Sequence, residues 1–134
     1  MQNATGRAVP LTWLLLDIQY TVDLISNARI LLNIRKVWSE DAMCLHCNSR
    51  FKVVDRVGDL PCYRTVWYEP TGIANILSMS MATKKFRVIF NSEGGNCFRM
   101  VLPDREVRFQ LSPNRLYYFD ALDRENIVLI LNTV

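Results

Sequence analysis

The sequence predicts an all-β protein, mainly β-strands with one or two short helices, built as a single domain. Many short strand-like runs alternate with turn-forming residues, a pattern typical of a barrel or sandwich. Half of the 134 residues are hydrophobic and 22% are charged, which supports a packed core. A chain of this length fits one compact domain, so an enzyme with two equivalent lobes on one chain is excluded.

The first part of the chain contains one well-marked strand. Residues 1–11 are mostly polar and are expected to form a flexible lead-in. The apolar run 13–17 ends in Asp17 and predicts a buried strand that delivers a carboxylate to its C-terminal end. Residues 22–34 are apolar but interrupted by asparagines, which allows either a turn or a short helix.

The middle of the chain predicts a hairpin and a further strand. Two β-rich stretches within residues 43–54 flank the turn-forming pair at 48–49. The Gly-Asp-Leu-Pro run at 58–61 is expected to break the chain before a strand at 65–68.

The second half predicts a short helix followed by strands. A turn at 70–72 precedes the expected helix at 76–83, whose C-terminal end carries Lys84 and Lys85, where cations are favoured. Further strands are expected at 86–90, 97–102, 106–111, 116–119 and 127–131.

Charge and hydropathy exclude several classes of protein. Sixteen Lys and Arg against thirteen Asp and Glu give a net charge of +3, and the basic residues are scattered, which favours a solvated surface over a nucleic-acid partner. The longest apolar run, 127–131, is far shorter than the roughly 20 residues that span a bilayer. Residues 1–5 lack the basic start of a signal peptide. We therefore expect an intracellular protein without a membrane partner.

The cysteines allow three interpretations. Cys44, Cys47, Cys62 and Cys97 could form two disulfides in an oxidising compartment, but free thiols fit an intracellular protein better. Together with His46, they also suggest a small zinc-binding adaptor. In a strand, however, Cys44 and His46 share one face while Cys47 points to the other, and no Gly is present to form a knuckle turn. We expect no metal and no cofactor.

Four stretches occur in an order that resembles the protease region of copia-type retroelement polyproteins of plants and diatoms. That family has an apolar strand ending in the catalytic Asp, a V-x-Y-x-P … N-L-L-S segment, a Y-x-V-x-F strand and a G-L-Y motif. The similarity covers roughly residues 12–120, and residues 121–134 would form a C-terminal strand leading toward the next polyprotein segment. The matching stretches are Trp13–Asp17, Val66–Pro70 with Ala74–Met79, Phe86–Gly94, and Leu116–Tyr118.

This resemblance implies a retropepsin-like acid-protease half-barrel with Asp17 at the catalytic position. Such an enzyme needs two carboxylates that share one proton, one acting as general base on a water while the other polarises the scissile carbonyl. A chain with one such Asp would act as a homodimer, each copy supplying one carboxylate across a two-fold axis. Its implied substrates are peptide segments of its own polyprotein, within an intracellular retroelement particle in the cytoplasm.

The active-site loop that follows Asp17 departs from the D-[ST]-G motif of the family. Ile18 replaces the Ser or Thr, Gln19 replaces the Gly, Tyr20 replaces a small residue, and Thr21 keeps a hydroxyl. Ile18 cannot donate the hydroxyl hydrogen bond that normally crosses the dimer axis. The alternative is therefore an inactive remnant that serves as a dimerisation or peptide-binding module. At the residue level, Asp17 could simply cap the turn that follows it.

The resemblance also gives roles to two other segments. His46, Cys47, Asn48 and Ser49 correspond in order to the flap that closes over the substrate, although a plain surface hairpin fits equally well. The segment 75–78 corresponds to the second apolar strand and short helix that pack beneath the active-site loop, which gives Ser78 a structural role. The aromatic residues are assigned to the core; they are Trp67, Tyr68, Phe86, Phe90, Tyr117, Tyr118 and Phe119.

Overall fold

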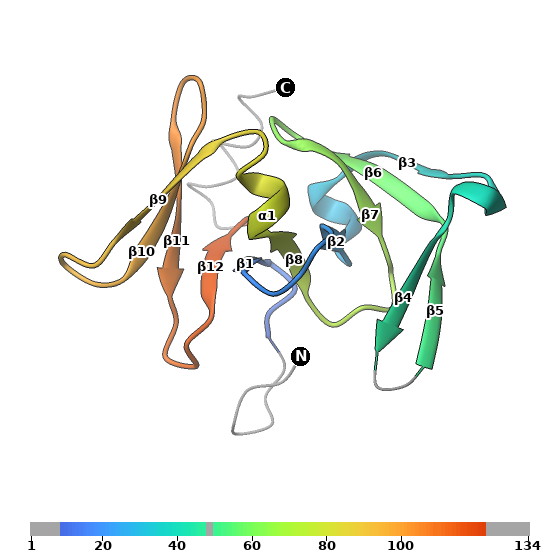
Figure 1. The fold of residues 1–134 in the computed structure, drawn as a ribbon, viewed down its shortest axis with the longest axis horizontal. Coiled ribbons are helices and arrows are strands. Elements are labelled where there is room, and N and C mark those ends of the chain that lie inside the picture. Colours follow the sequence, from blue (N-terminus) through green and yellow to red (C-terminus); the bar gives the residue numbers. More distant parts are fainter. Residues whose placement is uncertain (1–8, 48–49, 123–134) are drawn as a thin grey trace.

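The computed structural model describes residues 9–47 and 50–122, which form one ten-stranded sheet, a separate two-stranded hairpin and very little helix (Figure 1). The all-β prediction is confirmed. The elements are β1 (Trp13–Asp17), β2 (Leu24–Ile25), β3 (Leu32–Lys36), β4 (Met43–Cys47), β5 (Arg50–Val54), β6 (Arg56–Leu60), β7 (Arg64–Tyr68), β8 (Asn75–Ser78), α1 (Met79–Ala82), β9 (Arg87–Asn91), β10 (Cys97–Val101), β11 (Glu106–Leu111) and β12 (Tyr117–Asp120), with 3-10 turns at Ala28–Ile30 and Ser39–Asp41.

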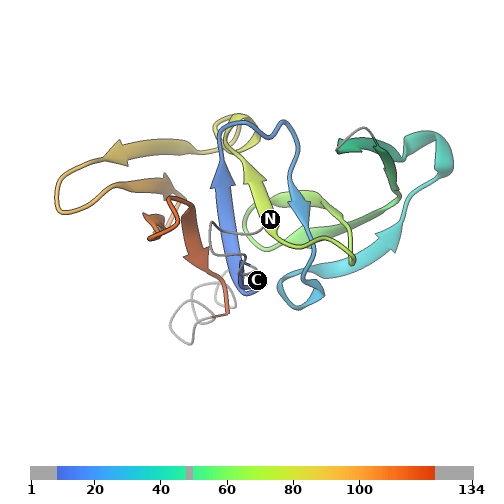
Figure 2. The same cartoon turned by 90° about the horizontal axis from the view of Figure 1, so that it is seen from below.

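Strand β8 lies between β1 and β2 at the centre of the sheet. It runs parallel to β1, with Asp17 opposite Ser78, and antiparallel to β2, with Leu24 opposite Ile76. The loop 18–23 that joins β1 to β2 therefore passes the C-terminal end of β8, as Figure 2 shows. Because Asp17 pairs with Ser78, the end of β1 lies beside the start of α1.

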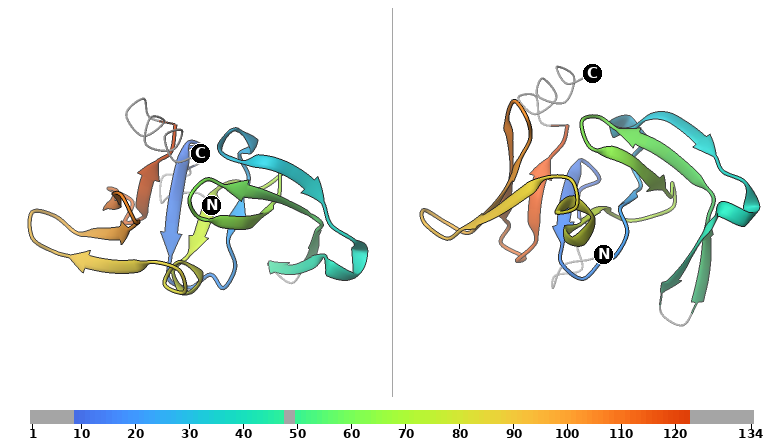
Figure 3. Two further views of the ribbon diagram at one scale, coloured as in Figure 1. Left: turned by 90° about the horizontal axis from the view of Figure 1, so that it is seen from above. Right: turned by 45° about the horizontal axis from the view of Figure 1, so that its top comes forward.

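On the other side of β1, the sheet continues as an antiparallel meander. The order of strands across the whole sheet is β3-β6-β7-β2-β8-β1-β12-β11-β10-β9. The β9–β10 pair and the β4–β5 hairpin lie at opposite ends of the molecule, with β1 and β8 between them (Figures 1 and 3). The strands predicted within residues 65–68, 86–90, 97–102, 106–111 and 116–119 are confirmed, and the stretch 127–131 lies outside the described residues.

Both faces of β1 are buried, which explains its continuous apolar run. Leu14 and Leu16 belong to the main core, whereas Leu15 packs on the opposite face in a smaller cluster. That smaller cluster includes Val9, which is 3% exposed although it lies in the expected lead-in. The main core also contains Ile25, Val66, Leu77, Met100, Phe109 and Phe119.

The predicted break at 58–61 is wrong for Gly58 and Asp59, because β6 continues through both residues to Leu60. A Cβ on Gly58 would lie 3.0 Å from the Leu31 side chain, so the glycine is needed for close packing rather than for a turn. Asp59 keeps its carboxylate at the surface, where it accepts hydrogen bonds from Thr65 and Arg35. Tertiary contacts therefore override the low strand propensity of both residues.

The helix predicted at 76–83 begins later than expected. All four residues of Asn75–Ser78 are buried and form β8, and only Met79–Ala82 is helical. Ser78 ends the strand and caps the helix, because its Oγ accepts from the N–H of Met81 at 3.3 Å. The region 22–34, which allowed a turn or a short helix, forms β2, a 3-10 turn and the start of β3.

The predicted hairpin strands and the predicted turn at 70–72 are confirmed. Strands β4 and β5 pair antiparallel around residues 48–49, which lie outside the described residues. The N–H of Gly72 donates to the carbonyl of Glu69, closing the turn expected at 70–72. No helix within the described ranges combines the length and apolarity needed to cross a membrane.

Candidate functional site

The carboxylate of Asp17 stands at the C-terminal end of the central strand β1. Its Oδ1 accepts a hydrogen bond from the N–H of Gln19 at 2.7 Å, which closes a tight turn. This is the bond expected of a turn-capping aspartate, and it also fixes the direction of the carboxylate. Ile18, between them, is 72% exposed. The loop thus presents an oriented acid and an exposed apolar side chain next to each other.

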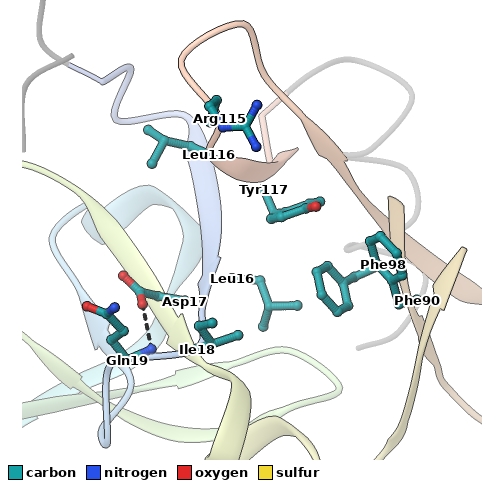
Figure 4. A pocket seen from close by; sticks show the side chains of 9 residues that line it. All are labelled: Leu16, Asp17, Ile18, Gln19, Phe90, Phe98, Arg115, Leu116 and Tyr117. Atoms are coloured by element: carbon teal, nitrogen blue, oxygen red, sulfur yellow. Dashed lines mark hydrogen bonds between the residues drawn. The ribbon is translucent and has the colours of Figure 1, made fainter. Parts of the chain in front are cut away.

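Asp17 borders an open cleft of about 560 Å³ (Figure 4). One wall is aromatic: the rings of Phe98 and Tyr117 meet edge to face at 4.7 Å, and those of Phe90 and Phe98 lie 4.9 Å apart. The cleft is lined by Leu16, Asp17, Ile18, Gln19, Phe90, Phe98, Arg115, Leu116 and Tyr117.

Sequence reasoning did not find this aromatic wall. Phe90 and Tyr117 were assigned to the core, but Phe90 is 48% exposed and both residues border the cleft. The alternation of β9 correctly puts Phe90 on its apolar face. Whether that face ends at the core or at a cleft depends on where β9 lies relative to β1, and no local pattern encodes that distance.

Ser78 holds the loop 18–23 in place through its side chain and its backbone N–H, as expected for a structural role. Its side chain is fully buried, and its Oγ donates to the carbonyl of Tyr20 at 2.7 Å. Its N–H donates to Oδ1 of Asp23 at 2.8 Å. The middle and the end of the loop 18–23 are therefore both attached to the junction between β8 and α1. Thr21 is exposed.

Asp23 is a buried carboxyl that the sequence analysis missed. It is 3% exposed, and its Oδ1 also accepts from the hydroxyl of Tyr63 at 3.2 Å. Burial raises the pKa of Asp23, and the hydrogen bonds from Ser78 and Tyr63 together with the charge of Arg64 only partly oppose this. Burial, followed by the neighbouring Asp23 charge, also raises the pKa of Tyr63. The available sign in the sequence that Asp23 is buried was its position just before the apolar residues of β2.

Asn75 joins the strands on both sides of β8. Its Oδ1 accepts from the N–H groups of Ser26 and Asn27, each at 2.9 Å. Its Nδ2 donates to the carbonyls of Leu11 at 2.8 Å and Trp13 at 2.9 Å. Every hydrogen-bonding position of this fully buried amide is therefore used, which explains a polar side chain at the centre of the sheet.

The proposed flap residues lie apart from the cleft. His46 is exposed on β4, and its ring meets that of Phe51 on β5 edge to face at 4.5 Å. Cys47 ends β4, and Asn48 and Ser49 lie outside the described residues. No described hairpin residue lines the Asp17 cleft. The structure therefore does not bring His46 together with Asp17.

One polar contact ties the hairpin to the body of the protein. Lys52 Nζ lies 3.3 Å from Oε2 of Glu69 and also donates to the hydroxyl of Thr71. Burial acts to raise the pKa of Glu69, but hydrogen bonds from Thr71 and the Lys52 ammonium outweigh it and lower that pKa. The lowered pKa favours the charged form of Glu69, and the contact attaches the middle of the hairpin, where Lys52 pairs with Leu45, to the rest of the protein.

The zinc interpretation finds no geometric support in the part of the chain that the structure describes. Strand β4 runs without a knuckle turn from Met43 to Cys47, and no three His, Cys, Asp or Glu side chains of the described residues converge. Within residues 9–47 and 50–122, Cys44 and Cys97 are free thiols.

Comparisons with models of protein families, with curated proteins and with solved structures found no match to this chain. The geometry around Asp17 and the ordered sequence motifs are therefore the basis for assigning a function.

Proposed function

We propose that this chain is a retropepsin-like aspartic endopeptidase domain of a copia-type retroelement. It acts as a homodimer within an intracellular particle and releases the capsid, integrase and reverse-transcriptase parts of its own polyprotein. The observation that carries the proposal is the oriented Asp17 carboxylate at the end of the central strand, beside an open aromatic cleft. In this position an acid can meet both a substrate and a second copy of itself.

The chemistry requires a second carboxylate, because one Asp17 cannot serve as general base and general acid together. A second copy of the chain related by a two-fold axis supplies it. Ile18 supports this arrangement, since a side chain 72% exposed beside the acid becomes buried when two such loops meet. The proton that the two carboxylates share then lies on the axis.

The cleft fits a peptide substrate. A volume of about 560 Å³ lies within the roughly 300–1,000 Å³ usual for ligand sites. The walls formed by Leu16, Phe90, Phe98 and Tyr117 suit a large apolar side chain next to the scissile bond. An extended peptide with such a residue would then cross the carboxylates.

The arrangement of β1, β8 and α1 supports a retropepsin-like half-barrel. The resemblance implies a second apolar strand and a short helix beneath the active-site loop. Strand β8 pairs with β1 at Asp17, and α1 begins directly after Ser78, which bonds to the loop at Tyr20.

Asp17→Asn tests the catalytic role directly. The change preserves size and an acceptor for the Gln19 N–H while removing the titratable acid. We expect it to abolish cleavage of a linker peptide from the same element, with an unchanged thermal unfolding transition. Asp41→Asn, on the exposed 3-10 turn Ser39–Asp41, is the matched control and should cleave normally. Cleavage that survives Asp17→Asn would remove Asp17 from the active site.

A second candidate is an inactive remnant that dimerises or binds peptides without cutting them. The observation that favours it is Ile18, whose side chain has no donor for the bond that usually crosses the dimer axis. Both candidates use the same cleft and the same loop contact. They differ in whether the two carboxylates reach the required geometry.

A further inference from the structure

Arg115 occupies an unusual backbone conformation at the mouth of the Asp17 cleft. Its φ is +66°, in the left-handed region that side chains other than Gly and Asn rarely adopt. Buried Ser112 holds the turn between β11 and β12 in this shape. Its N–H donates to the carbonyl of Leu116 at 2.8 Å, its carbonyl accepts from the N–H of Arg115 at 2.9 Å, and its Oγ accepts from the N–H of Leu116 at 3.0 Å.

Ser112 fixes the backbone of this turn, but no polar contact of the Arg115 side chain within the described residues explains why an arginine stands there. The guanidinium of Arg115 is exposed and forms no hydrogen bond or ion pair with any residue in the described ranges. Strained side-chain-bearing positions tend to gather where a group must be presented to a ligand. Here the turn directs the backbone so that Arg115 borders the cleft with Leu116 and Tyr117 (Figure 4).

The cleft has few charged side chains, one of each sign. Among its nine lining residues, Arg115 is the only cation and Asp17 is the only acid. The remaining walls are aromatic or aliphatic, apart from the amide of Gln19. A peptide that fills the apolar part therefore passes a single cation that has no hydrogen-bond or ion-pair partner among the described residues. A guanidinium forms paired hydrogen bonds with a carboxylate more readily than with any neutral group.

We propose that Arg115 binds a side-chain carboxylate of the peptide in the cleft, so that preferred peptides carry Asp or Glu close to a large apolar residue. The proposal rests on the proposed function only in taking a peptide as the occupant of the cleft. Arg115 thereby determines which sequences are selected and takes no part in bond cleavage.

Binding to the Asp17→Asn protein tests this without any requirement for catalysis. The probes are peptides with acetylated and amidated ends that contain one Phe or Leu. In each pair of peptides, one of the two positions before or after that residue carries either Glu or Gln. We expect the best Glu peptide to bind about threefold to fivefold more tightly than its Gln partner. The difference should shrink in 0.5 M salt, because the contact is exposed. Calorimetry or fluorescence anisotropy measures both affinities.

Two variants assign the effect to Arg115. Arg115→Gln should bind both peptides with the affinity of the Gln peptide, whereas Arg108→Gln should keep the full difference. Arg108 is a suitable control because it is exposed on β11 and does not line the cleft. If a Gln peptide with a free C-terminal carboxylate bound as tightly as the Glu peptide, the assignment to a side-chain carboxylate would be wrong. Equal affinity of the parent for Glu and Gln peptides, or no binding of either, would also overturn the proposal.

The same measurements separate this proposal from the proposed function. If the Asp17→Asn protein prefers Glu peptides to Gln peptides because of Arg115, and the unmutated protein cleaves no peptide, the Arg115 site is supported and the peptidase is rejected. Cleavage with no Glu over Gln selectivity rejects the Arg115 site and leaves the peptidase.

Discussion

The polar residues at the centre of this sheet are satisfied to very different degrees. Asn75 uses all its donors and acceptors. Asp23 does not: among the described residues its Oδ2 is buried without a hydrogen-bond partner, and Arg64 Nε lies 3.9 Å away. A buried carboxylate held this way is less well solvated than in water, which is why its neutral form is favoured.

Asp23 should therefore make stability depend on pH in a specific direction. The pKa of Asp23 in the folded protein lies above the ordinary value of 3.8. Its contribution to the free energy of unfolding is therefore fully present below pH 3.8 and is lost as the pH rises through the folded pKa. We expect the stability of the parent relative to Asp23→Asn to be greater at pH 3 than at pH 7. Urea unfolding of both proteins at the two pH values measures the change, and other carboxyls cancel in the comparison. A relative stability that rises with pH would contradict this.

At the scale of elements, the loop 18–23 combines firm attachment with unusual side chains. Its Asp17 end is closed by the Gln19 N–H, and its middle and end are bonded to Ser78 and Asp23. Ile18 points away from this support and is 72% exposed, whereas Tyr20 packs against the smaller apolar cluster. The backbone scaffold of the loop is thus intact, although the residues at three positions, Ile18, Gln19 and Tyr20, differ from those of the family that it resembles.

Restoring the family motif in this loop should raise peptidase activity if the chain is the proposed enzyme. The triple change Ile18→Ser, Gln19→Gly and Tyr20→Ala returns a hydroxyl and a small residue beside the acid. Misplacing a catalytic group by about 1 Å can cost on the order of 100-fold in rate, so we expect a gain of at least about tenfold. Turnover of one fluorogenic linker peptide by both proteins at mildly acidic pH measures it.

The control for this comparison is Tyr20→Ala alone, because that change removes packing from the smaller cluster. It should lower the unfolding temperature without a gain in rate. If the native loop is as fast as the restored one, the bulky residues are tolerated; if neither protein cuts, the inactive remnant is favoured.

At the scale of the whole molecule, the cleft and the exposed Ile18 lie on the same side of β1. We expect the domain to self-associate weakly, with the loop 18–23 of each copy at a two-fold contact. Ile18→Lys should shift the protein to monomer in sedimentation at high micromolar concentration, because it places two like charges near the axis. Ile73→Lys is the matched control: Ile73 is 56% exposed and precedes β8 at the end remote from Asp17.

The outcome distinguishes the dimer from other contacts. Association that Ile73→Lys disrupts and Ile18→Lys does not would place the contact elsewhere. A parent that remains monomeric at high micromolar concentration would count against a competent enzyme, since one chain supplies one catalytic carboxylate.

Local sequence patterns predict most of the strands of this protein. The apolar run that ends at Asp17, the hairpin around residues 48–49 and the strands after Phe86 follow from alternation and turn chemistry, which act over a few neighbouring residues. Only the three-dimensional arrangement shows that Asn75–Ser78 pairs between β1 and β2, that Asp23 lies against Ser78, and that Phe90 forms a wall of the cleft beside Asp17. These features join segments dozens of residues apart. They depend on strand pairing and burial, which local propensity does not specify.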